Sequence, residues 1–311
     1  MDYRKIIQLG DSSYVVSIPR KWIKENKLKK GDIVVIQEED SNIIIKLEEQ
    51  KTVEKPKEIV IEFGDMRDFQ EKFTYAYISN YNTIKIGGTK LKKILPQIKE
   101  FLNSFVALEL VYSDDTSIII KDYLDMKNIS MDETLRRIDR LIKSMAGTAE
   151  ECLKNPSKKL LDEIEAREVD INKFTNLSFK VLKKSFVGAD RSSLKIGVDN
   201  VFYYWEMVTI LEKIGDYIKR TPRNLKFKVD PKLIELYNKT IVLYNLAIKS
   251  HFTKDTKLAL DVDARKRSLF RECDTYFLKC TKKDIYILQR IREISSSLGA
   301  LTKILLRLHY N

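Results

Sequence analysis

The stretch Gly10-Asp11-Ser12-Ser13-Tyr14-Val15-Val16-Ser17-Ile18-Pro19-Arg20-Lys21-Trp22 decides how the front of the chain folds. Its first four residues favour a turn, Tyr14–Ile18 favour a strand, and Pro19 suits the first turn of a helix. Working outward, we predict a strand over Arg4–Leu9 and a short helix over Arg20–Lys27.

The next residues predict a hairpin. Lys30-Gly31-Asp32 favours a turn, and the apolar runs Ile33–Ile36 and Ile43–Ile45 are predicted to pair across the polar residues 38–42. About fifty residues in this order bury too little apolar surface for a stable core of their own. We therefore expect two copies to interleave their hairpins.

These residues resemble the AbrB/SpoVT family, whose small domain is a swapped-hairpin dimer that binds DNA. The likeness covers residues 2–49 and lies in the run Gly10–Trp22, in Leu28 and in Lys30-Gly31-Asp32. It implies a homodimer or higher oligomer and double-stranded DNA as a partner. The residues that it places on DNA are the basic ones on the first strand and beside the proline, and two serines that meet phosphates: Arg4, Lys5, Arg20, Lys21, Ser12 and Ser13.

The charges of this region are polarised. Residues 4–30 hold eight basic side chains against two acids, whereas residues 32–49 hold six acids against one lysine. A phosphate backbone requires a local basic surface, not a basic average. The pattern fits DNA contact, and a solvated lysine face is the alternative.

Composition favours a cytoplasmic protein without catalytic machinery. The 311 residues are 43% hydrophobic and 33% charged, which indicates two or three globular domains. No apolar run approaches the roughly 18 residues of a spanning helix, so we expect no membrane insertion, and the first residues do not resemble a signal peptide. Three cysteines without Cys-x-x-Cys spacing favour neither zinc nor disulfides. Two histidines, no nucleophile–base motif and no P-loop spacing predict that the chain is not an enzyme.

Residues 51–127 predict a small α/β unit after a polar linker over residues 51–57. Strands and helices alternate and then end in a hairpin, which suggests a sheet with two helices on one side. The expected strands are 58–63, 83–86, 105–112 and 117–121, and the expected helices are 66–79 and 91–104.

Residues 128–311 predict an antiparallel helical bundle. Apolar spacing gives helices over 131–153, 158–186 and 198–220, and the pattern repeats over 231–249, 256–280 and 284–309. Two three-helix repeats, about 128–222 and 229–311, follow. The predicted fold class is multidomain α+β: an N-terminal swapped-hairpin β domain (1–50), the α/β unit (51–127) and the bundle (128–311).

The bundle resembles the PhoU family of phosphate-uptake regulators, which have two tandem three-helix repeats. The matching runs are Glu168-Val169-Asp170-Ile171-Asn172 and Leu211-Glu212-Lys213-Ile214-Gly215-Asp216. In that family, acids four residues apart bind metal ions on the bundle surface. The resemblance thus implies a divalent or iron-type metal ion on the first helical repeat, held by Glu168, Glu212 and Asp216.

The acids that the family uses to bind metal ions are only partly present in this chain. Asn172 stands where the family has a second acid, and Arg292 and Ser296 stand where the second repeat would have acids. Two carboxylates one turn apart share a helix face and suit a hard cation. The alternative to a metal ion is neutralisation by lysines of the same helix, Lys213 and Lys219.

The net charge of +12 lies entirely in the bundle, because residues 128–311 hold 36 basic and 24 acidic side chains. Many of the cations lie on the second repeat: Arg265, Lys266, Arg267, Arg271, Arg290 and Arg292. They either pair with acids of the first repeat or bind phosphate or another anion, and the sequence leaves both open.

Together the two resemblances predict a DNA-binding regulator of phosphate uptake with a sensory or protein-docking helical domain. The alternative is a PhoU-type adaptor that does not bind DNA and docks on a phosphate transporter or a signalling kinase.

Overall fold

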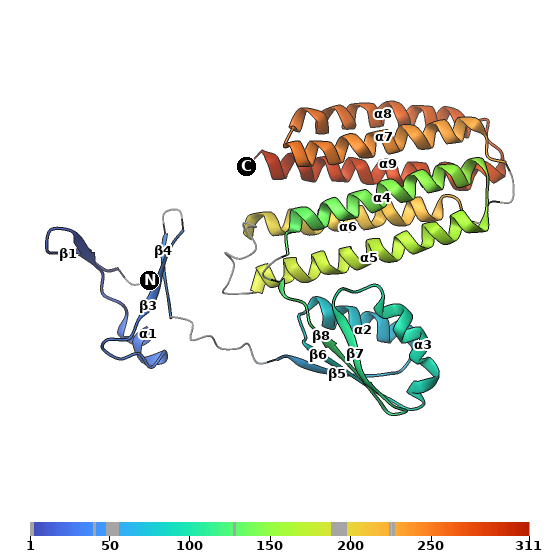
Figure 1. The fold of residues 1–311 in the computed structure, drawn as a ribbon. Helices are drawn as coiled ribbons and strands as arrows, with labels where there is room; N and C mark the ends of the chain where they lie inside the picture. The colour runs from blue at the N-terminus through green and yellow to red at the C-terminus, as the bar shows by residue number, and fades with distance from the viewer. Residues whose placement is uncertain are drawn as a thin grey trace. The chain divides into compact units, whose positions relative to one another are not determined.

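The computed structural model describes residues 3–39, 42–47, 56–126, 129–187, 198–223, 225 and 228–310. It contains two compact units, Met1–Lys55 and Pro56–Asn311, whose elements are labelled in Figure 1. We call them the N-terminal unit and the main unit. The division into residues 1–50, 51–127 and 128–311 stays a prediction, since the last two parts lie in one compact unit.

The N-terminal unit has the predicted order of elements. β1 (Ile7–Leu9) pairs antiparallel with β2 (Ser13–Val15), α1 spans Arg20–Glu25, and β3 (Val34–Glu39) pairs antiparallel with β4 (Asn42–Leu47). Gly10 enables the β1–β2 turn, because its φ of +71° is strained for other residues. β1 and β2 are shorter than predicted, since a two-stranded ribbon has no core to hold its ends.

The N-terminal unit has no core within one chain. Of its side chains that the structure describes, none is buried. Many of its large apolar side chains are exposed instead: Tyr3, Ile6, Ile7, Leu9, Tyr14, Val15, Val16, Ile33, Val35, Ile36, Ile43 and Leu47.

The main unit begins with the predicted α/β fold. Its chain order is β5 (Glu58–Glu62), α2 (Met66–Ile78), β6 (Thr83–Gly87), α3 (Leu91–Leu102), β7 (Leu108–Ser113) and β8 (Ser117–Asp122). The sheet order is β5-β6-β8-β7, with β5 parallel to β6 and the other pairs antiparallel. Isoleucines alternate along the strands, so one face forms apolar rows that join α2 and α3 in a single core.

The six predicted bundle helices are confirmed. They are α4 (Met131–Lys154), α5 (Lys158–Val187), α6 (Val198–Arg220), α7 (Pro231–Thr253), α8 (Thr256–Phe277) and α9 (Lys282–His309). Figure 1 shows the two three-helix repeats side by side. Two fully buried tyrosines link them: Tyr237 donates to the Ala146 carbonyl, and Tyr244 donates to Asp139, both at 3.1 Å. None of the helices in the described residues has the length and apolar character needed to span a bilayer.

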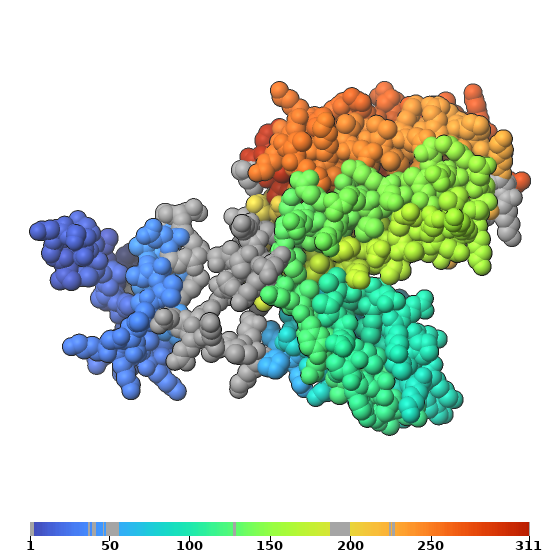
Figure 2. All heavy atoms as spheres, in the orientation of Figure 1, coloured from blue at the N-terminus to red at the C-terminus, as the bar shows by residue number. Residues whose placement is uncertain are grey.

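A buried ion pair fastens the α/β part to the bundle. The Lys180 ammonium of α5 lies 2.6 Å from a carboxylate oxygen of Asp122 at the end of β8, and it donates to the Tyr77 carbonyl of α2 at 2.9 Å. The two charged side chains are 2% and 6% exposed. α2 packs directly on α5, and Figure 2 shows this contact as a continuous surface. The sequence analysis missed this pair.

We predict that Lys180→Met destabilises the main unit by about 3–5 kcal/mol, because it leaves the Asp122 carboxylate buried without its counter-charge. The double variant Lys180→Met/Asp122→Asn should recover most of that loss. Urea unfolding of the full chain measures both.

The matched control is Lys72→Met. Lys72 makes an ion pair of similar length with Asp68, 2.7 Å, but these side chains are 54% and 42% exposed, so the expected loss is under about 1 kcal/mol. Equal losses in the free energy of unfolding for Lys180→Met and Lys72→Met would contradict the conclusion that burial makes the Lys180–Asp122 pair important for stability.

The two histidines of the chain meet where α7 and α9 end. The rings of His251 and His309 lie 5.4 Å apart between centroids, and His251 Nδ1 and His309 Nε2 are buried without a hydrogen-bond partner among the described groups. Burial lowers the pKa of His251 to about 4, helped by the charge of His309, while Asp132 acts in the opposite direction. His251 is therefore neutral in the fold.

We predict that this histidine makes the bundle acid-sensitive. A pKa of about 4 in the fold against 6.5 when exposed means that the unfolded chain binds more protons between those pH values. The free energy of unfolding therefore falls as pH drops from 6.5 to 4, by about 3 kcal/mol. Comparison with His251→Phe by urea unfolding at pH 7 and pH 4 isolates this loss, and parallel pH profiles for the two proteins would refute it.

Candidate functional site

The predicted DNA-contacting residues lie on the N-terminal unit, and all six are exposed. Arg4 and Lys5 precede β1, while Arg20 and Lys21 begin α1. The antiparallel register sets Ile7 opposite Val15, so the residues before β1 and those after β2 leave the ribbon at the same end. The four predicted basic side chains are therefore attached to this end.

The two serines lie at the other end of that ribbon. Ser12 is in the turn after Gly10, and Ser13 begins β2 opposite Leu9. One chain therefore separates the six predicted residues into a basic group and a serine group. Lys21 also lies 3.9 Å from Glu25, an exposed contact worth well under about 1 kcal/mol that leaves the lysine available to a phosphate.

The three predicted metal ligands do come together, on the facing sides of α5 and α6. We call Glu168, Glu212 and Asp216 the acidic face. A lysine lies within it: Lys219 Nζ is 2.7 Å from Glu168 Oε1 and 3.2 Å from Asp216 Oδ1. The sequence analysis named Lys219 as a competing partner, and it joins the two helices.

Other donors complete the acidic face. Arg220 donates to the second oxygen of Asp216 at 2.6 Å, and the Asn172 amide donates to Glu168 Oε1 at 2.8 Å. Burial raises the pKa of Glu212, and the negative charges of Asp216 and Glu168 add to this effect.

This arrangement fits an ion-paired helix surface better than a metal site. Two of its carboxylates already accept charged or amide donors. In the described part of the chain, no three side chains of the His, Cys, Asp or Glu types are placed to hold one metal ion. A metal ion on the first repeat stays a prediction.

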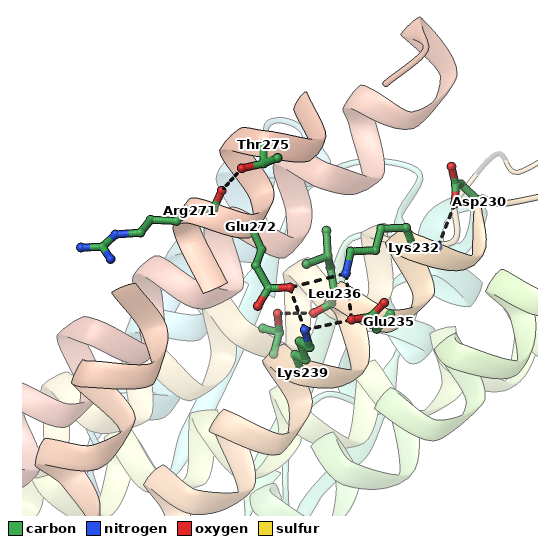
Figure 3. A network of polar contacts seen from close by, with 9 residues as sticks. Asp230, Lys232, Glu235, Leu236, Lys239, Arg271, Glu272 and Thr275 are labelled. Atoms are coloured by element: carbon green, nitrogen blue, oxygen red, sulfur yellow. Dashed lines mark hydrogen bonds and ion pairs between the residues drawn. The ribbon is translucent and has the colours of Figure 1, made fainter. Parts of the chain in front are cut away.

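Most of the second-repeat cations named from the sequence pair with acids of their own repeat. Arg265 pairs with Asp261 and Arg267 with Asp263, each at 2.8 Å, and Arg290 and Arg292 pair with Glu293 and Asp274. Lysines follow the same rule in Figure 3, where Lys232 and Lys239 bridge Glu235 and Glu272, and the Arg271 side chain points away from the network. Pairing with first-repeat acids is thus wrong for these four arginines.

Two of the three cysteines are poor nucleophiles. Cys152 and Cys273 are buried and unpaired, and burial raises the pKa of both thiols, that of Cys273 to about 11. Because the thiolate is the reactive form, these two side chains are suited to packing.

Two regions of the chain match known protein families. Residues 7–55 match the family described as antidote-toxin recognition MazE, bacterial antitoxin, and residues 135–221 match the PhoU domain. No curated protein matches the chain. The PhoU match covers the first helical repeat and includes the acidic face. The chain therefore joins a MazE/AbrB-like domain to a PhoU domain.

Proposed function

We propose that the chain is a DNA-binding regulator of phosphate homeostasis, a binding protein rather than an enzyme, that acts in the cytoplasm as a homodimer or higher oligomer. The observation that carries this proposal is the presence in one chain of a MazE/AbrB-like domain and a PhoU domain. The first is of a DNA-binding type, and the second is typical of phosphate regulation.

Self-association is supported by the exposed apolar side chains of the N-terminal unit. Ile36 on β3 is 61% exposed and Ile43 on β4 is 68% exposed, although strand residues of this kind normally form a core. At about 25 cal/mol per Å², covering such side chains with a second copy would supply the stability that one copy lacks. Interleaved hairpins would cover both strands.

We predict that Ile36→Asp converts the full chain from an oligomer to a monomer, because it puts a charge into the proposed interface. Light scattering gives the mass. The control is Val242→Asp, a comparable residue on α7 that is 53% exposed, and it should keep the oligomer. A wild-type monomer, or an Ile36→Asp protein of unchanged mass, would contradict the proposal.

We predict that Arg20→Ala/Lys21→Ala weakens duplex DNA binding by removing about two phosphate contacts. The slope of log affinity against log salt concentration should flatten by about 2, at roughly 0.9 per contact. Lys92→Ala/Lys93→Ala removes the same charge from exposed positions of α3 and should change neither slope nor affinity. If both pairs behave alike, the DNA surface is elsewhere.

The regulatory part of the proposal is tested in cells. DNA recovered with the protein from cells grown at high and at low phosphate should be enriched for sites beside phosphate-uptake genes, and the enrichment should change with phosphate. Recovery that is random or independent of phosphate would argue against the proposed role.

A second candidate, a protein-docking adaptor, is supported by a groove of about 740 Å³ between α8 and α9. Phe277 and Ile285 line it at 53% and 39% exposure, and neighbouring Leu278 is 84% exposed. Exposed apolar patches of this kind mark interaction surfaces. An adaptor would dock a phosphate transporter or signalling protein through this groove, and its wild-type chain would not bind duplex DNA.

A further inference from the structure

We propose that Lys219 is the built-in cation of the acidic face, so that the PhoU domain of this chain holds its α5–α6 surface together without a divalent metal ion. Nothing in this proposal depends on DNA binding. It concerns which positive charge neutralises Glu168, Glu212 and Asp216.

The position of the Lys219 ammonium is the first reason. It contacts a carboxylate on each helix, Glu168 at 2.7 Å and Asp216 at 3.2 Å, and thus bridges α5 and α6 as a shared cation would. The three side chains are 18–25% exposed. Ion pairs in such partly buried sites are screened less than surface pairs.

The remaining donors are the second reason. Arg220 and Asn172 hydrogen-bond to the same carboxylates. Together with Lys219, they occupy Glu168 Oε1 and both oxygens of Asp216, which are atoms that a hard cation would need.

The second repeat places a lysine in the corresponding position. Glu168 and Lys266 each lie ten residues after the first residue of their helix, α5 and α8. Lys266 Nζ is 2.9 Å from Asp263, and its side chain is 16% exposed. Arg292 on α9 corresponds to Glu212 on α6 in the alignment of the two repeats. The same offset makes Gly299 on α9 correspond to Lys219 on α6.

Gly299 creates the space for that lysine. A Cβ at this position would lie 2.2 Å from Lys266 Nζ, which is far inside contact distance. The ammonium therefore lies against the α9 backbone, between the second and third helices of its repeat. Both repeats therefore have a lysine ammonium between their second and third helices. In the first repeat it belongs to Lys219 of the third helix, α6, and in the second repeat to Lys266 of the second helix, α8.

The acidic face is open to ions in solution. Glu168 and Lys219 line a cleft of about 500 Å³ whose wall also includes Glu100 of α3. A metal ion could enter this cleft, so competition with the resident ammonium, rather than access, decides whether one binds. With Lys219 in place, the carboxylates of the acidic face are neutralised whether or not a divalent metal ion is present.

The test is thermal melting of the full chain after removal of metals, with and without added manganese, magnesium or iron(II). The proteins are wild type, Lys219→Met and the control Lys213→Met, which removes an exposed lysine of the same helix. We expect no shift for wild type or for Lys213→Met. Lys219→Met should melt lower and regain roughly 5 °C or more with an ion at 100 times its dissociation constant, because the freed carboxylates then bind it.

Two outcomes overturn the proposal: a wild-type protein that any of these ions stabilises, and a Lys219→Met protein that none of them stabilises. If Lys219→Met does not fold, Lys219→Gln keeps a polar group at the position and is judged by the same two criteria.

Discussion

The buried ion pair between Lys180 and Asp122 is the constraint on which the main unit depends. Removing two charges from water is costly, and the cost is recovered only when the partners and their hydrogen bonds are held in one geometry. The Tyr77 carbonyl, 2.9 Å from the ammonium, and the Tyr77 ring, 4.4 Å away, complete that geometry. Three elements far apart in sequence, α2, β8 and α5, therefore have one way of packing together. The α/β part and the first helical repeat behave as one body.

Local pairing also governs the charge of the bundle. The excess of cations predicts a basic surface, yet four arginines of the second repeat, Arg265, Arg267, Arg290 and Arg292, pair with acids of that repeat. Exposed pairs of this kind add little stability, but they reduce the field that a distant anion would meet. The net charge of a segment thus overstates its attraction for anions, and the charges that matter are those without a neighbour of opposite sign.

The sequence predicted the elements that carry a strong pattern. The six bundle helices follow from long apolar periodicity. The end of α6 at Arg220 was predicted to the residue, because Pro222 follows it closely. The α/β order followed from the alternation of strands and helices. The resemblance to the PhoU family named Glu168, Glu212 and Asp216 together, and the structure places them on the facing sides of α5 and α6.

What the sequence could not predict depends on contacts between distant segments. Lys180 is one of several lysines near the end of α5, and nothing local distinguishes it from Lys183 and Lys184, which are only half-buried. His251 and His309 lie far apart in sequence and meet only because α7 and α9 end at the same place. β1 and β2 were predicted too long, because strand propensity reflects packing against neighbouring strands. In the described part of the chain, this two-stranded ribbon has no further strand beside it. The same lack of a core within one chain leaves Ile36 and Ile43 exposed.

This contrast in burial bears on how the two ends of the chain could cooperate. The main unit has its own buried cores within one chain. The N-terminal unit has no described residue that is buried. In the proposed oligomer, its stability would come from association, and its folded fraction would depend on protein concentration. If two copies join there, each DNA-bound dimer carries two basic groups, and the binding of the second is intramolecular. Under the proposed function, a partner of the PhoU-like domain would not need to reshape the proposed DNA-contacting residues to change DNA affinity. It would be enough for the partner to favour or hinder the pairing of two chains, because an unpaired N-terminal unit would lose its core and half of its proposed phosphate contacts together.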